Sequence, residues 1–186
     1  MIEDESLEDA PLSEGEKYMA LFFTSPEWDV EFKTQVKIRN LKGDSKSYRV
    51  ADFYLPRYGI YVEFLGQWDV NEDARNRYRE KRKVYLKNDI PFIEIYPNQL
   101  GILDFAFPYR MRKALNDRGM RKELWKFNFD RWWERISFAG LLLFAFLIFI
   151  SWSNDFDNIW NMAASAVLGL WIRKAWKLWN QLAYVT

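Results

Sequence analysis

Two uncharged stretches near the C-terminus constrain this chain more than any other feature. They run from Ile136 to Trp152 and from Asn158 to Ile172, and neither contains an Asp, Glu, Lys or Arg. The first offers no polar stripe to turn toward water, as a surface helix would need. Each approaches the length that crosses the ~30 Å hydrocarbon layer of a bilayer, for which about 20 residues are typical. We therefore expect a membrane-spanning helical hairpin over residues 136–179.

The residues around this hairpin indicate its orientation. Basic residues lie outside the two stretches and only acids lie in the loop between them, which is the positive-inside pattern. The bases are Arg131, Arg135, Arg173, Lys174 and Lys177. Most of the ten Trp lie at the ends of the stretches, where indole rings settle at a membrane interface. We expect both termini and the folded domain on the cytoplasmic side of an inner membrane.

A buried hairpin in a soluble protein is the alternative, because short apolar stretches also form core helices. The second stretch contains the polar residues Asn158, Asn161 and Ser165, and small residues recur from Ala163 to Gly169. Small residues let helices approach closely within a membrane. Besides the lipid bilayer, a homo-oligomer or partner subunits are therefore candidate contacts of the hairpin.

The remainder of the chain divides into three parts. Residues 1–12 are acidic and predict a disordered leader, residues 13–99 have the pattern of a folded domain, and residues 100–135 form a basic and aromatic helical linker. Ser13 with Glu16 predicts a helix start. The elements expected next are strands over Trp28–Arg39, Tyr48–Leu55 and Ile60–Leu65, a helix over Glu72–Lys87 and a strand over Pro91–Tyr96. This order predicts an α/β (α+β) fold, a mixed sheet flanked by helices.

The composition limits the chemistry that such a domain can perform. The chain has no His and no Cys, which excludes disulfides, thiolate nucleophiles, imidazole bases and zinc sites built on sulfur or imidazole. Catalysis is left to carboxylates, Lys, Tyr or Ser, and a metal must be a hard, oxygen-bound ion such as magnesium or manganese.

One pair of acids stands out on the predicted sheet. Asp52 lies near the end of one expected strand and Glu63 lies within the next, and the short segment Pro56–Gly59 joins them as a turn. Adjacent antiparallel strands can bring two such carboxylates close enough to share a divalent cation. The alternative is that both are ordinary exposed strand residues.

The amino-acid sequence around these two acids resembles that of a known family. The segments Arg-Val-Ala-Asp-Phe-Tyr-Leu-Pro and Gly-Ile-Tyr-Val-Glu-Phe-Leu-Gly are similar to the core of the PD-(D/E)XK, or restriction-endonuclease-like, nucleases, in particular their very-short-patch-repair-like branch. The resemblance covers about residues 13–100. It implies a restriction-endonuclease-like sheet, phosphodiester cleavage, and Mg²⁺ (or Mn²⁺) held by Asp52, Glu63 and the first-helix acid Glu16, with Glu14 the less favoured choice.

The chain also departs from the family pattern. Ala51 replaces a frequent Pro, and Leu65 stands where the family has its catalytic Lys. Some branches carry this Lys on the following helix, so the resemblance favours Lys81 as its substitute, with Gln67 as a second catalytic candidate. The repair-type branch often uses a His at this point, which this chain lacks.

The charged helix after the second acid predicts contacts with nucleic acid. Arg75, Arg79 and Lys83 are the candidate phosphate-binding residues, although a solvated helix face explains them equally well. The sequence thus predicts a membrane-tethered, magnesium-dependent endonuclease, with DNA favoured over RNA and a role in defence against phage or incoming DNA. The alternative is a catalytically decayed, nuclease-like membrane scaffold or sensor.

Overall fold

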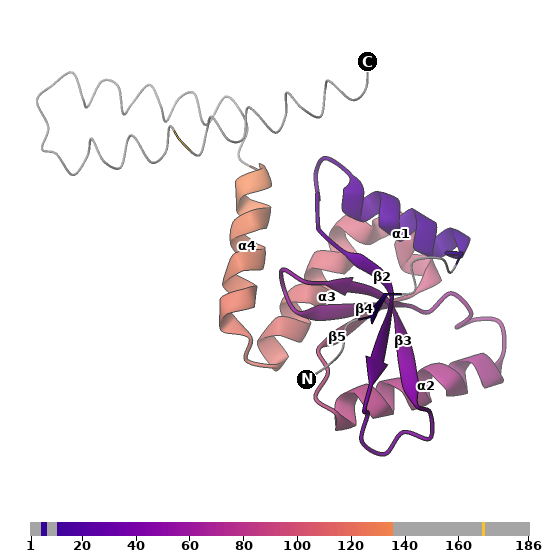
Figure 1. The fold of residues 1–186 in the computed structure, drawn as a ribbon. Helices are drawn as coiled ribbons and strands as arrows, with labels where there is room; N and C mark the ends of the chain where they lie inside the picture. Colours follow the sequence, from indigo (N-terminus) through magenta and orange to yellow (C-terminus); the bar gives the residue numbers. More distant parts are fainter. Residues whose placement is uncertain (1–4, 7–10, 136–168, 170–186) are drawn as a thin grey trace, which may run out of the picture. The chain divides into compact units, whose positions relative to one another are not determined.

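A computed structural model describes residues 5–6, 11–135 and 169 (Figure 1). Its elements, in chain order, are β1 (Glu5–Ser6), α1 (Glu14–Thr24), β2 (Lys33–Arg39), β3 (Tyr48–Leu55), β4 (Ile60–Phe64), α2 (Glu72–Lys87), β5 (Phe92–Ile95), the 3₁₀ helix η1 (Pro97–Ile102), α3 (Leu103–Asp117) and α4 (Arg121–Arg135). The predicted order of one helix, three strands, one helix and one strand is confirmed from α1 to β5.

The strands form one mixed sheet in the order β1-β2-β3-β4-β5. Neighbouring strands are antiparallel except β4 and β5, which are parallel and are joined through α2. A parallel pair needs a crossover connection, and a helix is its usual form. The α+β class with a mixed sheet and flanking helices is therefore confirmed.

Local signals explain where the elements around the sheet begin and turn. Ser13 caps α1 in a capping box with Glu16, and the Asn71 side chain accepts a hydrogen bond from Ala74 N at the start of α2. The turn between β3 and β4 contains Gly59 at φ +63°, a left-handed conformation that suits glycine. Its amide and that of Tyr58 donate to Leu55 O, which closes the turn.

Helices cover both faces of the sheet, with α1 on one side and α2 on the other (Figure 1). The larger buried cluster joins α1 and α3 to β3, β4 and β5, and includes Phe23, Phe53 and Phe107. The smaller one joins β2, β3 and β4 to α2 through Tyr61 and Tyr85. All five residues of β4 are buried, as expected of a strand with strands on both sides and helices on both faces.

The structure differs from the sequence expectation in several places. β2 begins at Lys33, five residues later than expected, because Ser25 O accepts hydrogen bonds from Trp28 N and Asp29 N in a turn. Two residues of the acidic leader are not disordered: β1 pairs with the edge of β2, whose backbone groups would otherwise lack partners. The compact unit that contains the sheet extends to Asp130, so α3 and most of α4 belong to the folded domain.

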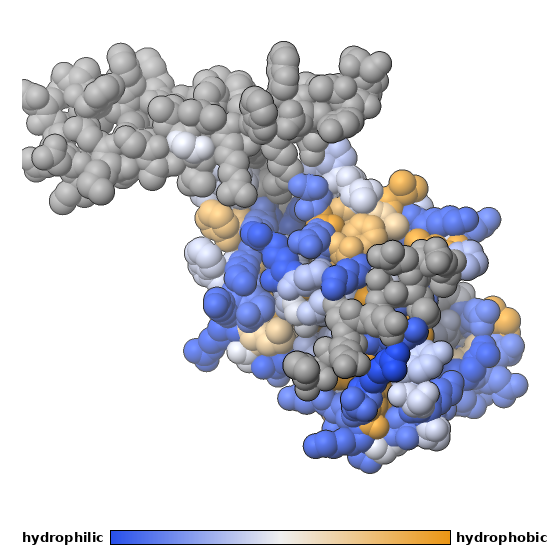
Figure 2. All heavy atoms as spheres, in the orientation of Figure 1, coloured by the Kyte–Doolittle hydropathy of each residue, from blue (hydrophilic) through white to orange (hydrophobic). Residues whose placement is uncertain are grey.

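Hydrophilic residues dominate the visible surface of the described part, with hydrophobic ones between them (Figure 2). Among the described helices, none is both long enough and apolar enough to span a membrane. The predicted hairpin over residues 136–179 lies outside the described residues, apart from Gly169. The leader residues 1–4 and 7–10 lie outside them as well.

Candidate active site

Asp52 on β3 and Glu63 on β4 occupy opposed positions in adjacent antiparallel strands. The register pairs Phe53 with Val62 and Tyr54 with Tyr61, and its continuation places Asp52 opposite Glu63. The backbone amide of Phe64 donates to Asp52 Oδ2 at 2.7 Å, which holds the carboxyl against β4. Directly opposed side chains share one face of a sheet, so the expected approach of the two acids is found.

Two side chains of α2 reach the Glu63 carboxyl from above the sheet. The Lys81 ammonium forms an ion pair with Glu63 Oε2 and donates to Val50 O at 2.6 Å. The Tyr85 hydroxyl donates to Glu63 Oε1 at 2.8 Å. Lys81 and Tyr85 lie one helical turn apart and therefore face the same side of α2. Glu63 is buried, with 3% of its surface exposed, and both of its oxygens have partners.

Burial and mutual charge shift the pKa values of all three groups. Burial raises the pKa of Asp52 well above its usual value, and the negative charge of Glu63 adds to this. Burial also raises the pKa of Glu63, against the opposing effect of Lys81. For Lys81, burial alone would lower the pKa, but the charges of Glu63 and Asp52 raise it above the usual value. Lys81 thus remains an ammonium and compensates two carboxylates that repel each other.

Glu16 lies near this cluster because α1 packs tightly on β4. A Cβ on Gly15 would lie 2.1 Å from a ring carbon of Phe64, so any larger residue at this position would force the ring to move. The charge of Glu16 contributes to the raised pKa of Asp52. However, one Glu16 oxygen accepts a hydrogen bond from Ser13 N at 2.7 Å, within the capping box. Within residues 11–135, no three acids converge as a metal-binding group.

The donor set nevertheless suits a hard cation. Asp52 Oδ1 has no hydrogen-bond partner among the described residues, and Glu63 offers a second carboxylate directly across the strands. Magnesium usually binds one or two carboxylates and completes its shell with water. The Lys81 ammonium contacts Glu63 Oε2, so a cation bound through this oxygen would have to share or displace that contact.

The other predicted site residues make their hydrogen bonds and ion pairs, within the described part of the chain, with groups other than the two acids. Gln67 follows β4. Its backbone N–H donates to the Tyr78 hydroxyl, and its side-chain oxygen accepts a hydrogen bond from Arg77. Arg75 and Arg79 both pair with Glu72, and Lys83 is exposed on α2. The structure brings Lys81 to the acids, and it does not bring Gln67 to them by any hydrogen bond of the described residues.

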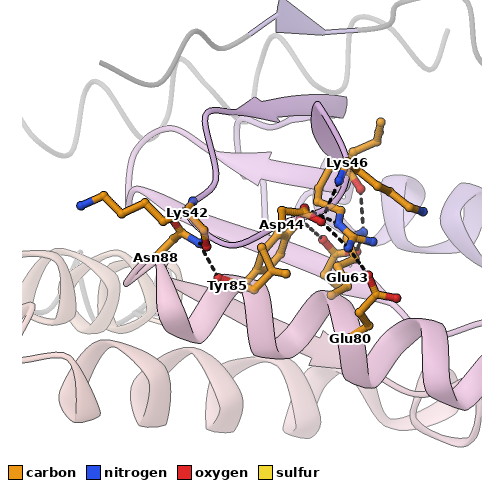
Figure 3. A network of polar contacts seen from close by, with 11 residues as sticks. Lys42, Asp44, Lys46, Glu63, Glu80, Tyr85 and Asn88 are labelled. Atoms are coloured by element: carbon orange, nitrogen blue, oxygen red, sulfur yellow. Dashed lines mark hydrogen bonds and ion pairs between the residues drawn. The ribbon is translucent and has the colours of Figure 1, made fainter.

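Sequence reasoning missed a polar network that fixes the loop before β3 to α2. Arg49 is buried and makes two hydrogen bonds to Asp44, at 2.6 and 2.7 Å, and one to Glu80 at 2.5 Å. At the far end of the loop, Lys42 N donates to the Asn88 side chain. Figure 3 shows this network and the neighbouring Glu63 and Tyr85. No simple pattern identifies such an Arg, since basic residues in strands are usually exposed.

A cleft opens between this loop and α2, with a volume of about 580 Å³. Its lining residues are Lys46, Ser47, Tyr48, Arg49, Val50, Arg77, Tyr78 and Lys81. Lys81 links the cleft to the acids, because its ammonium contacts Glu63. Lys81 also lines a cavity of about 10 Å³, together with Leu65, Tyr85 and Glu94, among others, and Glu94 pairs with Arg82. No protein-family model, curated protein or solved structure matches this chain.

Proposed function

We propose that this protein is a metal-dependent nuclease that hydrolyses phosphodiester bonds at the Asp52, Glu63 and Lys81 cluster. The observation that carries the proposal is the Lys81 ammonium placed on a cross-strand pair of acids. Placing the half-buried carboxylate of Asp52 opposite the buried carboxylate of Glu63 adds little to the stability of the fold, even with Lys81 from α2 to compensate their charge. Such arrangements of perturbed groups are typical of reactive sites.

Each residue of the cluster has a role in this proposal. Asp52 and Glu63 would hold Mg²⁺ or Mn²⁺ through their oxygens, with Glu16 as an outer acid. When bound, the ion supplies positive charge that makes water a stronger nucleophile and neutralises the phosphate. Lys81 places a fixed positive charge where the pentacovalent phosphate gains negative charge. Tyr85 orients Glu63 by donating to Oε1, so that Oε2 faces Lys81.

The finer fold assignment belongs to the same proposal. The order of elements from α1 to β5 and the resemblance around Asp52 and Glu63 support a restriction-endonuclease-like domain. Leu65 is buried at 2% exposure beside Lys81, and both line the small cavity next to Glu63. A Lys delivered from α2 can therefore serve the same carboxylates as a Lys delivered from the strand.

The experiment is a cleavage assay on the full chain with labelled DNA and RNA, with Mg²⁺ or Mn²⁺. We expect Asp52→Asn and Lys81→Met each to reduce the rate at least about 100-fold, the size of effect that loss of a charge-stabilising group produces. Asp73→Asn and Lys83→Met are the matched controls, because both residues are exposed on α2. The double variant Leu65→Lys with Lys81→Met should recover part of the activity. Cleavage that survives Asp52→Asn would refute the site.

A catalytically decayed module is the second candidate. Lys81 already neutralises Glu63, and the described residues contain no group of three acids for a metal. Calorimetry with Mn²⁺ separates the two candidates. Binding heat that disappears in Asp52→Asn supports the nuclease, whereas the absence of any such heat in the parent supports a scaffold or sensor.

We also propose that the nuclease is tethered to the inner face of a bacterial-type membrane through the uncharged stretches of its C-terminal part. A tethered nuclease would meet DNA that enters the cell, which fits a role in defence against phage. The support is the sequence pattern of residues 131–179. Membrane fractions washed with high salt should retain the full chain, and release into the soluble fraction would contradict the tether.

A further inference from the structure

We propose that the cleft between the β2–β3 loop and α2 binds a single strand of nucleic acid and leads it to the acid pair. This inference rests on the proposed nuclease function and specifies its substrate class. The cleft measures about 580 Å³, and its Lys81 end adjoins Glu63. A strand held along it would present a phosphate to Asp52, Glu63 and Lys81.

The first argument is charge. Of the described residues that line the cleft, four are basic and none is acidic. Arg49 and Lys81 are compensated by acids outside the lining. Lys46 has no ion-pair partner among the described residues, and Arg77 donates only to the neutral amide of Gln67. Lys46 and Arg77 thus leave an excess of positive charge on opposite walls, as a groove that tracks a phosphate backbone requires.

The second argument is the placement of aromatic rings. Tyr48 is 42% exposed, and with Tyr78 it lines the cleft between the basic residues. Basic grooves with exposed rings are typical of proteins that bind single strands, because unpaired bases stack on such rings. In a duplex the bases are stacked inside the helix, so these rings favour an unpaired strand.

The third argument is rigidity. The loop that carries Lys46 is held at both ends, since Arg49 joins Asp44 to Glu80 and Asn88 bonds to Lys42 (Figure 3). Asp44 also accepts from the backbone amide of Lys46 at 3.1 Å. A wall fixed in this way needs little reorganisation on binding, and binding to a preorganised wall costs less entropy.

The inference separates two sets of basic residues on α2. Arg77 lies in the cleft, whereas Lys83 and Arg79 are not among its lining residues. Arg79 is also paired with Glu72. The sequence singled out Arg75, Arg79 and Lys83 for nucleic acid, but the geometry favours Lys46 and Arg77.

The test is fluorescence anisotropy with a labelled 12-nucleotide oligothymidine and a labelled 12-base-pair duplex. It uses the full chain carrying Asp52→Asn, so that neither probe is cut. We expect tighter binding of the single strand. Lys46→Met and Arg77→Met should each weaken it about fivefold at 0.1 M salt and reduce the salt slope by about 0.7, the contribution of one single-strand phosphate. Tyr48→Leu should weaken it at least about fivefold.

Matched controls are Lys83→Met and Tyr109→Leu, both exposed and outside the cleft, which should bind like the parent. Equal or tighter binding of the duplex, or parental affinity in the three cleft variants, would overturn the inference. Its failure is distinct from failure of the proposed function. Cleavage that depends on Asp52 but not on the cleft residues would leave a nuclease without this groove. Binding in the cleft without any metal-dependent cleavage would leave the groove without a nuclease.

Discussion

Replacing Asp52 with Asn should make the folded protein more stable at neutral pH while removing the proposed nuclease activity. The pKa of Asp52 is raised well above its usual value, first by burial and then by the charge of Glu63. The folded state therefore resists ionisation of this carboxyl more than the unfolded chain does. Asn has nearly the same shape, and its amide oxygen can still accept the hydrogen bond from Phe64 N.

The expected gain follows from the geometry. Opposed side chains on antiparallel strands are about 5 Å apart, and two negative charges at that distance repel by about 3 kcal/mol at an effective dielectric constant of 20. The Lys81 ammonium offsets a similar amount, and the cost of burying the Asp52 charge then remains. We expect Asp52→Asn to raise the free energy of unfolding by about 1–3 kcal/mol at pH 7.

The pH dependence gives the sign of the effect. A raised pKa in the folded state contributes stability below the unfolded pKa, and this contribution is lost as pH rises through the folded pKa. The advantage of Asp52→Asn should thus be absent at acid pH and grow toward neutral pH. Pulse proteolysis of the full chain in urea and mild detergent measures it, with Asp73→Asn as the control. A variant that is less stable than the parent at pH 7 would refute the reasoning.

Two further predictions concern the supports of the site. Arg49→Met should lower the free energy of unfolding by about 2–4 kcal/mol, because it removes the guanidinium partner of the Asp44 carboxylate, whose side chain is shielded from solvent. Since the hydrogen bond from Arg49 lowers the pKa of Asp44, the parent should lose this stability as pH falls through that pKa, and urea titrations of the variant should show a smaller loss. Phe127→Ala should lower the free energy of unfolding by about 3–5 kcal/mol, because the ring is fully buried and its centroid lies 5.4 Å from that of Tyr58. Phe129→Ala, at 38% exposure, should cost under half as much in the same assay.

The sequence predicted the central part of the fold because its signals there are local. β3 and α2 have the expected bounds, and the short turn between β3 and β4 suffices to place Asp52 opposite Glu63. Lys81 was expected beside the acids from the family resemblance rather than from spacing. Its contact with Glu63 shares one face of α2 with the contact of Tyr85, which the sequence did not predict.

The remaining contacts depend on tertiary packing, which no local pattern contains. The basic and aromatic composition of residues 100–135 predicted a linker, but Phe107 and Met111 are fully buried in the core beneath the sheet. Arg49 lies within the alternating pattern of β3. Its partners come from tertiary structure, Asp44 from the path of the β2–β3 loop and Glu80 from the position of α2. The cleft arises from the same loop, so its basic residues could not be distinguished from those of the exposed helix face.

The cluster of Asp52, Glu63 and Lys81 connects the proposed site with the cleft. Lys81 brings positive charge to Asp52 and Glu63, and the charges of these two acids raise the pKa of Lys81. The same ammonium lines the cleft, so a phosphate arriving there would compete with Glu63 for it. Release of Glu63 Oε2 would then free a carboxylate oxygen for a metal ion at the moment when a negatively charged substrate is present. If the proposed function holds, the substrate and the ion would favour each other's binding, because each would replace one half of the ion pair.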